Sequence, residues 1–109
     1  MPRFVPAQMI IFTMFNLPGG EMFYTKTEYS TYGKGGYHEI EKLCTSESFA
    51  KAAMTGSGRC ETKNIQPQAI PNKIWLALLG AHPRYHPVAA AIIEKYGPER
   101  EKMREQPAS

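Results

Sequence analysis

A glycine-rich loop with a lysine inside it, Gly33-Lys34-Gly35-Gly36, is the first stretch whose residue types could do chemistry. Successive glycines let backbone N–H groups turn toward one point, so such a loop could hold a phosphate, above all if a helix began at Tyr37. The spacing matches neither the G-x-x-x-x-G-K-S/T pattern nor the G-x-G-x-x-G pattern of nucleotide-binding loops. A plain turn that joins two elements is therefore the interpretation we favour for this loop.

Tyrosines and a second lysine surround the loop. Exposed tyrosine beside lysine can stack on bases or anchor a protein partner, whereas tyrosine also simply suits the surface of a pleated sheet. The candidate binding residues are Tyr24, Lys26, Tyr29, Tyr32, Lys34, Gly35, Gly36 and Tyr37.

The run Tyr32-Gly33-Lys34-Gly35-Gly36, followed by Ile40 and Leu43, resembles the G-x-x-G loop of KH RNA-binding domains. In that family the loop clamps the nucleic-acid backbone, so the resemblance implies nucleic-acid contact here. It covers about a dozen residues. Its isoleucine falls one place late, and a β-rich stretch precedes the loop where the family has a helix.

A metal site is not predicted. His82 and His86 have the H-x3-H spacing of a zinc pair, but Pro83 and Pro87 keep them from lining one helical face. The two cysteines, Cys44 and Cys60, lie 16 positions apart, whereas a zinc finger needs them two to four apart. We expect hydrogen-bonded loop histidines and no cofactor.

Cysteine catalysis would need Cys44 or Cys60 as a thiolate held by a base, with His38 and Glu39 or Glu41 as the nearby candidates. Cys44 falls on an apolar face, which favours a buried, inert thiol. We assign no catalytic residue, and an enzyme is the less favoured class. The cysteines could pair in an oxidising compartment, but two free thiols in a cytoplasmic protein are the favoured alternative.

Length and charge suit one soluble domain. The chain has 109 residues and a net charge of +3, with its 13 lysines and arginines spread along it, so a surface covered by nucleic acid is not indicated. Arg3 precedes an apolar run, but Pro6 and Gln8 interrupt the start of that run, and no signal peptide is expected. The run is too short to cross a membrane, and we predict a cytoplasmic protein.

The apolar run Met9 to Leu17 is the element around which the other elements, and with them the candidate residues, should be arranged. It is apolar on both faces at the two-residue period, which predicts a central strand with cover on each side. Pro18 to Glu21 predicts a turn, and Met22 to Tyr32 alternates as the second strand of a hairpin. Residues 37–44 match both a helical face and a strand alternation, and we favour a helix.

Further along, a helix is predicted over residues 46–54, with Thr45 or Ser46 as its N-cap and Gly56 as its stop. Arg59 to Ile65 should be a third strand on the free edge of the core strand. A nearly all-apolar helix from Pro71 or Asn72 to Gly80 should be largely buried. A last helix should begin at Pro87 and stop at Gly97 and Pro98, leaving a polar tail from about residue 98.

These patterns predict an α+β class: a small antiparallel sheet built on an N-terminal β-hairpin, packed against two or three helices, in one domain over residues 1–109. The C-terminal helices should cover one face of the sheet and the middle helix part of the other. The favoured function is a small non-enzymatic protein-binding module, an adaptor or inhibitor of a larger protein, with phage-type accessory proteins as a guess from base rates. The alternative is a weak nucleic-acid binder that uses the glycine loop and tyrosines. No membrane partner is expected, and a homodimer through a sheet edge stays open.

Overall fold

The computed structural model describes residues 8–32 and 36–105. They form a four-stranded mixed sheet with three α-helices, so the predicted α+β class and its N-terminal hairpin are confirmed. The strands are β1 (Gln8–Asn16), β2 (Met22–Tyr32), β3 (Gly36–Cys44) and β4 (Arg59–Asn64), in the order β3-β2-β1-β4. The helices are α1 (Ser46–Thr55), α2 (Asn72–Leu79) and α3 (Pro87–Glu105), with a short 3-10 turn, η1 (Pro67–Ala69), before α2.

The β1–β2 hairpin forms as its sequence predicts. Its register places Phe15 opposite Phe23, and the two rings stack with their centroids 4.8 Å apart. In the turn, the Leu17 N–H donates to the carbonyl of Glu21 and Gly20 adopts a φ of 94°, a value that favours glycine. The apolar run is thus a strand with neighbours on both edges, β2 and β4.

Residues 36–44 are a strand and not the predicted helix. β3 pairs antiparallel with β2 along its whole length, with Thr25 opposite Leu43 and Lys26 opposite Lys42. The helical and the alternating patterns both fit this stretch locally. Pairing with the open edge of β2 decides between them, because every backbone group that faces β2 gains a partner.

The sheet is also not wholly antiparallel. β4 does pair with the free edge of β1, as predicted, but the two strands run parallel. The direction follows from α1, which links β3 to β4 as a crossover, so β4 leaves the helix running the same way as β3 and β1. Thr45 caps the start of α1 by accepting from the Ser48 N–H at 3.1 Å, and Gly56 ends it in the left-handed conformation.

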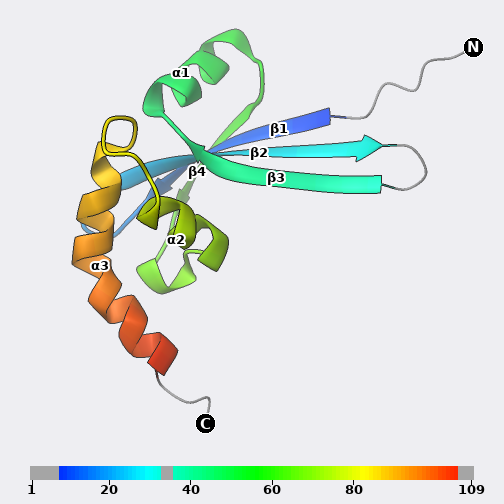
Figure 1. The fold of residues 1–109 in the computed structure, drawn as a ribbon. Coiled ribbons are helices and arrows are strands. Elements are labelled where there is room, and N and C mark those ends of the chain that lie inside the picture. Colours follow the sequence, from blue (N-terminus) through cyan, green and yellow to red (C-terminus); the bar gives the residue numbers. More distant parts are fainter. Residues whose placement is uncertain (1–7, 33–35, 106–109) are drawn as a thin grey trace, which may run out of the picture.

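The helices cover opposite faces of the sheet (Figure 1). We call the side that carries Phe15, Phe23 and Leu43 the main-core face, because these residues pack with α2 and α3. The other side, which carries Phe12, Tyr24 and Cys44, is the α1 face. There the Phe49 ring of α1 lies 5.4 Å from that of Tyr24. The predicted distribution of helices over the two faces is therefore found.

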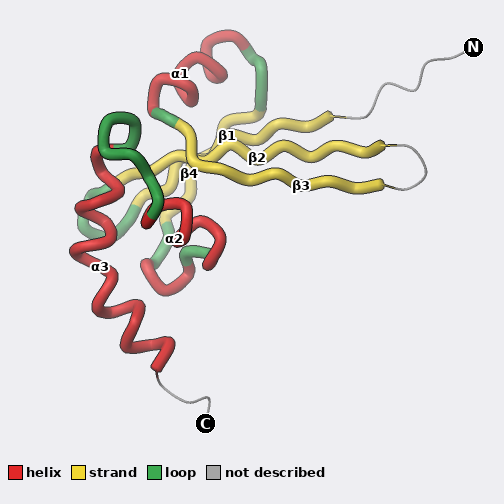
Figure 2. The backbone as a smooth tube through the Cα atoms, viewed as in Figure 1, coloured by secondary structure: helices red, strands yellow, loops and turns green. Residues whose placement is uncertain are grey.

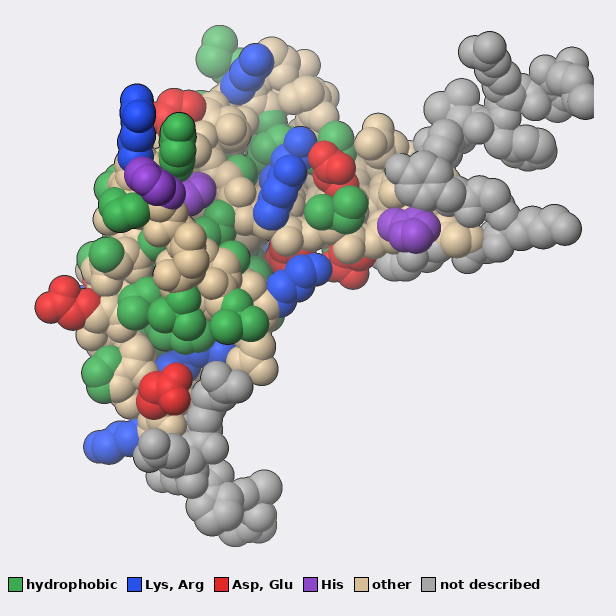
Figure 3. All heavy atoms as spheres, viewed as in Figure 1, with side chains coloured by type: hydrophobic (Ala, Val, Ile, Leu, Met, Phe, Trp, Pro, Cys, Tyr) green, Lys and Arg blue, Asp and Glu red, His purple; other side chains and the backbone are tan. Residues whose placement is uncertain are grey.

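The main core lies between the sheet and the two C-terminal helices. Ile92 of α3 is fully buried, and it is surrounded by the other members of the cluster: Phe15, Leu17, Phe23, Ile70, Ile74, Trp75, Leu78, Ala89 and Tyr96. α2 is less buried than predicted, because Ile74, Trp75 and Leu78 are buried whereas Leu76 and Leu79 are 64% and 54% exposed. Apolar surface is visible over this helix in the space-filling view (Figure 3).

The last helix does not stop at Gly97 and Pro98. α3 continues through Pro98 to Glu105, even though proline removes one backbone donor inside a helix. The reason lies in Arg100, which is 6% exposed and reaches back to η1 and α2. The residues after Pro98 thus include a buried anchor and not only solvated polar side chains.

A carboxylate ties α3 to the β1–β2 turn. Glu21 accepts a hydrogen bond of 2.7 Å from the Tyr96 hydroxyl and pairs with Lys95 at 3.0 Å, while the Gly19 N–H donates to the Tyr96 oxygen. A Cβ at Gly19 would run into the Lys95 ammonium and the Tyr96 hydroxyl, so a side chain there would displace these groups. The hydrogen bond from Tyr96, followed by smaller contributions that include Lys95, lowers the pKa of Glu21 from 4.5.

This lowered pKa predicts a stability difference that depends on pH. A carboxyl group with a lower pKa in the folded state contributes stability above its unfolded pKa of about 4.5, and the contribution is lost as the pH falls through the folded value. Urea midpoints should therefore fall more between neutral pH and about pH 3 for the wild type than for Glu21→Gln. Lys26 also lowers the pKa of Glu28, but it does so in the wild type and in the variant alike. The effect of Glu21 is therefore the difference between the two falls in urea midpoint. Equal falls would remove Glu21 from this role.

Candidate binding groove at the end of β3

Two open hollows adjoin the C-terminal end of β3. The first has a volume of about 710 Å³ and the second about 570 Å³. The lining residues that they share are Leu43, Cys44, Thr45, Tyr85 and His86, and we call the two hollows together the groove. The two hollows adjoin each other at these shared residues.

Several separate parts of the chain build the groove. The sheet contributes residues of both faces, with Cys44 from the α1 face and Leu43 from the main-core face, and α1 contributes residues that follow its cap at Thr45. The ends of α2 and α3 that flank the 82–86 connector add further apolar lining. The connector turns tightly because the N–H groups of Tyr85 and His86 both donate to the carbonyl of His82. The Arg84 N–H donates to His82 Nδ1 at 3.1 Å, which holds that ring against the turn.

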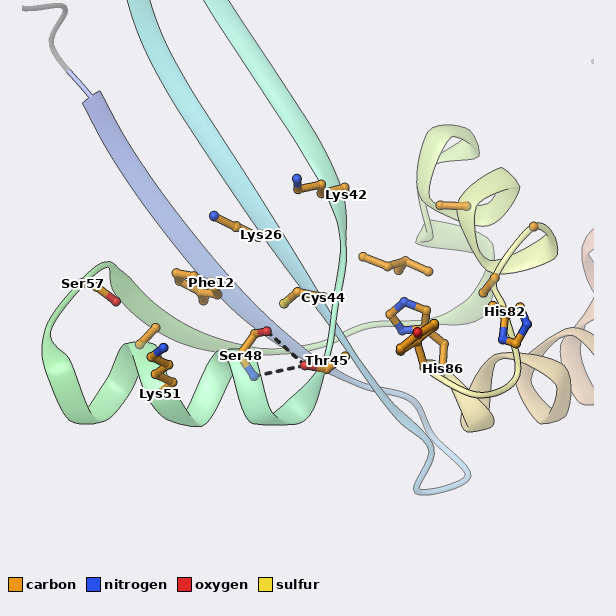
Figure 4. Close-up of a pocket in the computed structure, with 16 residues that line it drawn as sticks. Phe12, Lys26, Lys42, Cys44, Thr45, Ser48, Lys51, Ser57, His82 and His86 are labelled. Carbon is orange, nitrogen blue, oxygen red and sulfur yellow. Dashed lines mark hydrogen bonds between the residues drawn. The ribbon is translucent and has the colours of Figure 1, made fainter.

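The larger hollow has a basic rim. Figure 4 shows Lys26 and Lys42 on neighbouring strands, Lys51 on α1, and His82 and His86 across the hollow from them. Its floor is apolar, with Phe12 and Leu43 among the lining residues, and the Lys26 ammonium lies 5.8 Å from the centre of the Phe12 ring. No carboxylate is found among the described residues that line this hollow, so its chemistry favours an anionic group.

The two faces of the neighbouring edge strand β3 also differ in the sign of their charged side chains. Ile40 and Lys42 share the α1 face with Cys44, whereas Glu39 and Glu41 share the main-core face with Leu43, because successive side chains alternate. Ile40 is 53% exposed. Figures 1 and 2 show the first half of β3 extending beyond α1 and α2, with no other described element beside its outer edge.

The predicted binding residues do not gather at one place. Tyr24 and Lys26 lie on the α1 face and line the groove, but Tyr24 also packs on Phe49. Tyr29 pairs with Met9 and Glu39 on the opposite face of the sheet. Gly36 opens β3, while Lys34, Gly35 and the side chains of Tyr32 and Tyr37 lie outside the described residues.

The glycine loop also lacks the structural context that its sequence suggested. Gly36 and Tyr37 continue into β3, so no helix N-terminus follows the loop to strengthen a phosphate site. Strands flank the loop on both sides, which limits the resemblance to KH domains to the residue types. The groove residues that the sequence did not single out include Lys42, Lys51 and Tyr85, which come from three distant segments.

Cys44 is not an activated nucleophile. Burial raises the pKa of its thiol to about 11, so the thiol is protonated at neutral pH. His38 lies six residues away along β3, about 20 Å, and cannot serve as its base. Cys60 lies on β4, with β1 and β2 between it and β3 in the sheet. Both cysteines are free thiols in this structure.

We therefore predict slow alkylation at Cys44. At neutral pH iodoacetamide should modify it far more slowly than a free thiol with an ordinary pKa, and the rate should rise with pH until the pKa of about 11 is approached. Mass spectrometry of peptides from timed reactions would give the rate, with the Cys60→Ser variant used to isolate Cys44. A rate at neutral pH that exceeds that of a model thiol would contradict the raised pKa and revive the catalytic interpretation.

Two further features bear on the class of protein. Among residues 8–32 and 36–105, no group of three or more His, Cys, Asp and Glu side chains could hold a metal ion. Within the same ranges, no helix has the length and apolar character needed to cross a membrane.

The site and fold define a small α+β protein with a basic groove beside an open strand edge. Comparison with protein-family models, with curated proteins and with solved structures found no match to this chain.

Proposed function

We propose that this protein is a non-enzymatic protein-binding module, an adaptor or inhibitor, that takes up an extended segment of a partner as a new strand beside β3. The observation that supports this function best is the open outer edge of β3, which projects past the helices. An open edge presents unpaired N–H and C=O groups that a partner strand can satisfy, and neighbouring pockets then select its side chains. The groove lies where such a strand would continue past Lys42.

Exposed Ile40 adds to this support. Proteins commonly blunt an edge strand with charged side chains, a bulge, a proline or an element that covers it. The projecting half of β3 carries charged Glu39 and Glu41, but it contains no proline or bulge, and its register with β2 is unbroken from Gly36 to Cys44. A free, regular edge with an exposed apolar side chain gives a partner both main-chain hydrogen bonds and apolar contact.

Proline substitution in β3 tests the proposal. Neighbouring residues in a strand direct their backbone N–H groups to opposite edges of that strand. Of the two variants Glu39→Pro and Ile40→Pro, one therefore loses a hydrogen bond to β2, and the other loses only the N–H group that points away from the sheet. The variant that keeps the wild-type melting temperature is the edge-blocked protein. Immobilised wild type should capture a protein partner from nuclease-treated extract of the source cells, and the edge-blocked protein should not. Equal capture by both would overturn the proposed edge.

Self-association through β3 is not expected to be strong. In an antiparallel pair of two β3 strands, each face of one copy meets the same face of the other, so glutamate faces glutamate in the neighbourhood of Glu39 and Glu41. We predict a monomer at micromolar concentration in light scattering at low salt. A stable dimer that is lost in the edge-blocked protein would show instead that the partner is a second copy.

A nucleic-acid binder is the second candidate, and the basic rim of Lys26, Lys42 and Lys51 favours it. Lys26 is already paired with Glu28 at 2.9 Å, which weakens its attraction for a phosphate. Salt separates the two functions, because nucleic-acid affinity falls steeply with added salt whereas strand pairing with apolar contact changes little. Capture that disappears after nuclease treatment would favour this candidate.

A further inference from the structure

We infer that the strand which pairs with β3 carries acidic side chains on one face and basic side chains on the other, around an apolar residue opposite Ile40. This inference rests on the proposed function and specifies its partner. Support for it comes from the two faces of β3, which carry opposite charges. Because side chains alternate along a strand, each face meets a different set of partner side chains.

On the α1 face, the incoming strand meets positive charge. Lys42 is exposed at the edge and supplies the charge there, while Lys26, directly opposite it on β2, is paired with Glu28 at 2.9 Å. Beyond Lys42 the strand would enter the larger hollow, where Lys51 and two histidines complete a lining without a carboxylate among its described members. Acidic side chains at alternate positions of the partner would be held there.

On the main-core face, the same strand meets negative charge. Glu39 is exposed and Glu41 half-buried, and neither forms a salt bridge with any residue in the described part of the chain. Basic side chains at the intervening positions of the partner would lie directly across from them. Opposite charges directly across a strand pair stabilise it and like charges destabilise it.

An eight-residue peptide and its charge-exchanged control provide the probe. Paired antiparallel from Thr45 to His38, the matching peptide reads Ser-Glu-Val-Glu-Lys-Ile-Lys-Thr, which places glutamate across from Cys44 and Lys42 and lysine across from Glu41 and Glu39. The control reads Ser-Lys-Val-Lys-Glu-Ile-Glu-Thr. The two peptides have the same composition, net charge and strand propensity, so only the placement of charge differs.

Titration of ¹⁵N-labelled full-length protein with each peptide, followed by NMR, gives both affinity and location. The matching peptide should bind at least about tenfold more tightly than the control, with shifts concentrated in β3. The triple variant Glu39→Lys, Glu41→Lys, Lys42→Glu changes only side chains of the edge strand β3 and should reverse the preference. Equal affinities, or a preference that the triple variant leaves unchanged, would overturn the inference.

A random peptide library separates this inference from the proposed function. Peptides selected on the wild type but not on the edge-blocked protein should show the alternation of acidic and basic positions. If the peptides selected on the wild type alone lack this alternation, the proposed strand addition stands and the inferred charge pattern is rejected. Selection that is identical on the two proteins, together with no response to either peptide, would reject both.

Discussion

Replacing Phe15 by alanine should lower the free energy of unfolding by about 3 to 5 kcal/mol, because it opens a cavity in the middle of the main core. The Phe15 ring is 8% exposed and stacks on Phe23 at an interplanar angle of 19°. The surrounding side chains come from the sheet and both C-terminal helices, so they cannot close over the vacancy without shifting whole elements. Urea unfolding, followed by the fluorescence of Trp75, would measure the loss of unfolding free energy.

Phe12→Ala is the matched control for this prediction. Phe12 is equally well buried, at 6%, but it lies on the α1 face and lines the larger hollow. Water from the hollow can enter the space that the ring leaves, so the expected loss is smaller than for Phe15. Because β1 is apolar on both faces, its sequence pattern by itself would give Phe12 a full core loss of about 3 to 5 kcal/mol. A larger loss at Phe12 than at Phe15 would move the main core to the α1 side.

Arg100→Ala should be the second most destabilising change, with an expected loss of about 3 kcal/mol. One guanidinium nitrogen donates to the carbonyl of Pro67 at 3.2 Å, and the other donates to Asn72 Oδ1 at 2.8 Å. The guanidinium carbon also lies 4.8 Å from the centre of the Trp75 ring. Alanine would leave the buried Pro67 carbonyl without its donor, and would remove the stacked cation and the bond to Asn72.

Arg100→Lys distinguishes the shape of the side chain from its charge. Lysine keeps a positive charge but cannot supply the planar fork of donors or stack as a plane on the indole, so an intermediate loss is expected. Circular dichroism would show in addition whether α3 shortens toward Pro98 in either variant. A change of less than about 0.5 kcal/mol for Arg100→Ala would mean that the contact contributes no more than a surface residue.

The elements that could be predicted are those with one dominant local signal. The turn at Pro18 to Glu21 fixes the β1–β2 hairpin, and Thr45 and Gly56 delimit α1, because these residues act on the backbone next to them. The pairing of Arg59 to Asn64 with the core strand followed from an apolar strand that needed a second neighbour. These predictions required no knowledge of distant contacts.

The predictions that were wrong concern positions at which local signals compete. Residues 37–44 fit both periods, and only the hydrogen bonds to β2 make them a strand. The pair Gly97 and Pro98 carries a strong local stop signal, yet the helix continues through it to a buried anchor at Arg100. A charged residue near the end of a polar stretch gives no sequence signal that it will be buried.

By itself, the sequence of this protein determined an α+β fold organised on an apolar strand, because hydrophobic period, turns and caps are properties of neighbouring residues. Tertiary structure alone decided that β3 is an edge strand and that Lys26, Lys42, Lys51, His82 and His86 line one groove. These side chains come from segments far apart in the chain, and their proximity depends on strand order and on which face each helix covers. Neither is encoded in the spacing of the residues that form the site.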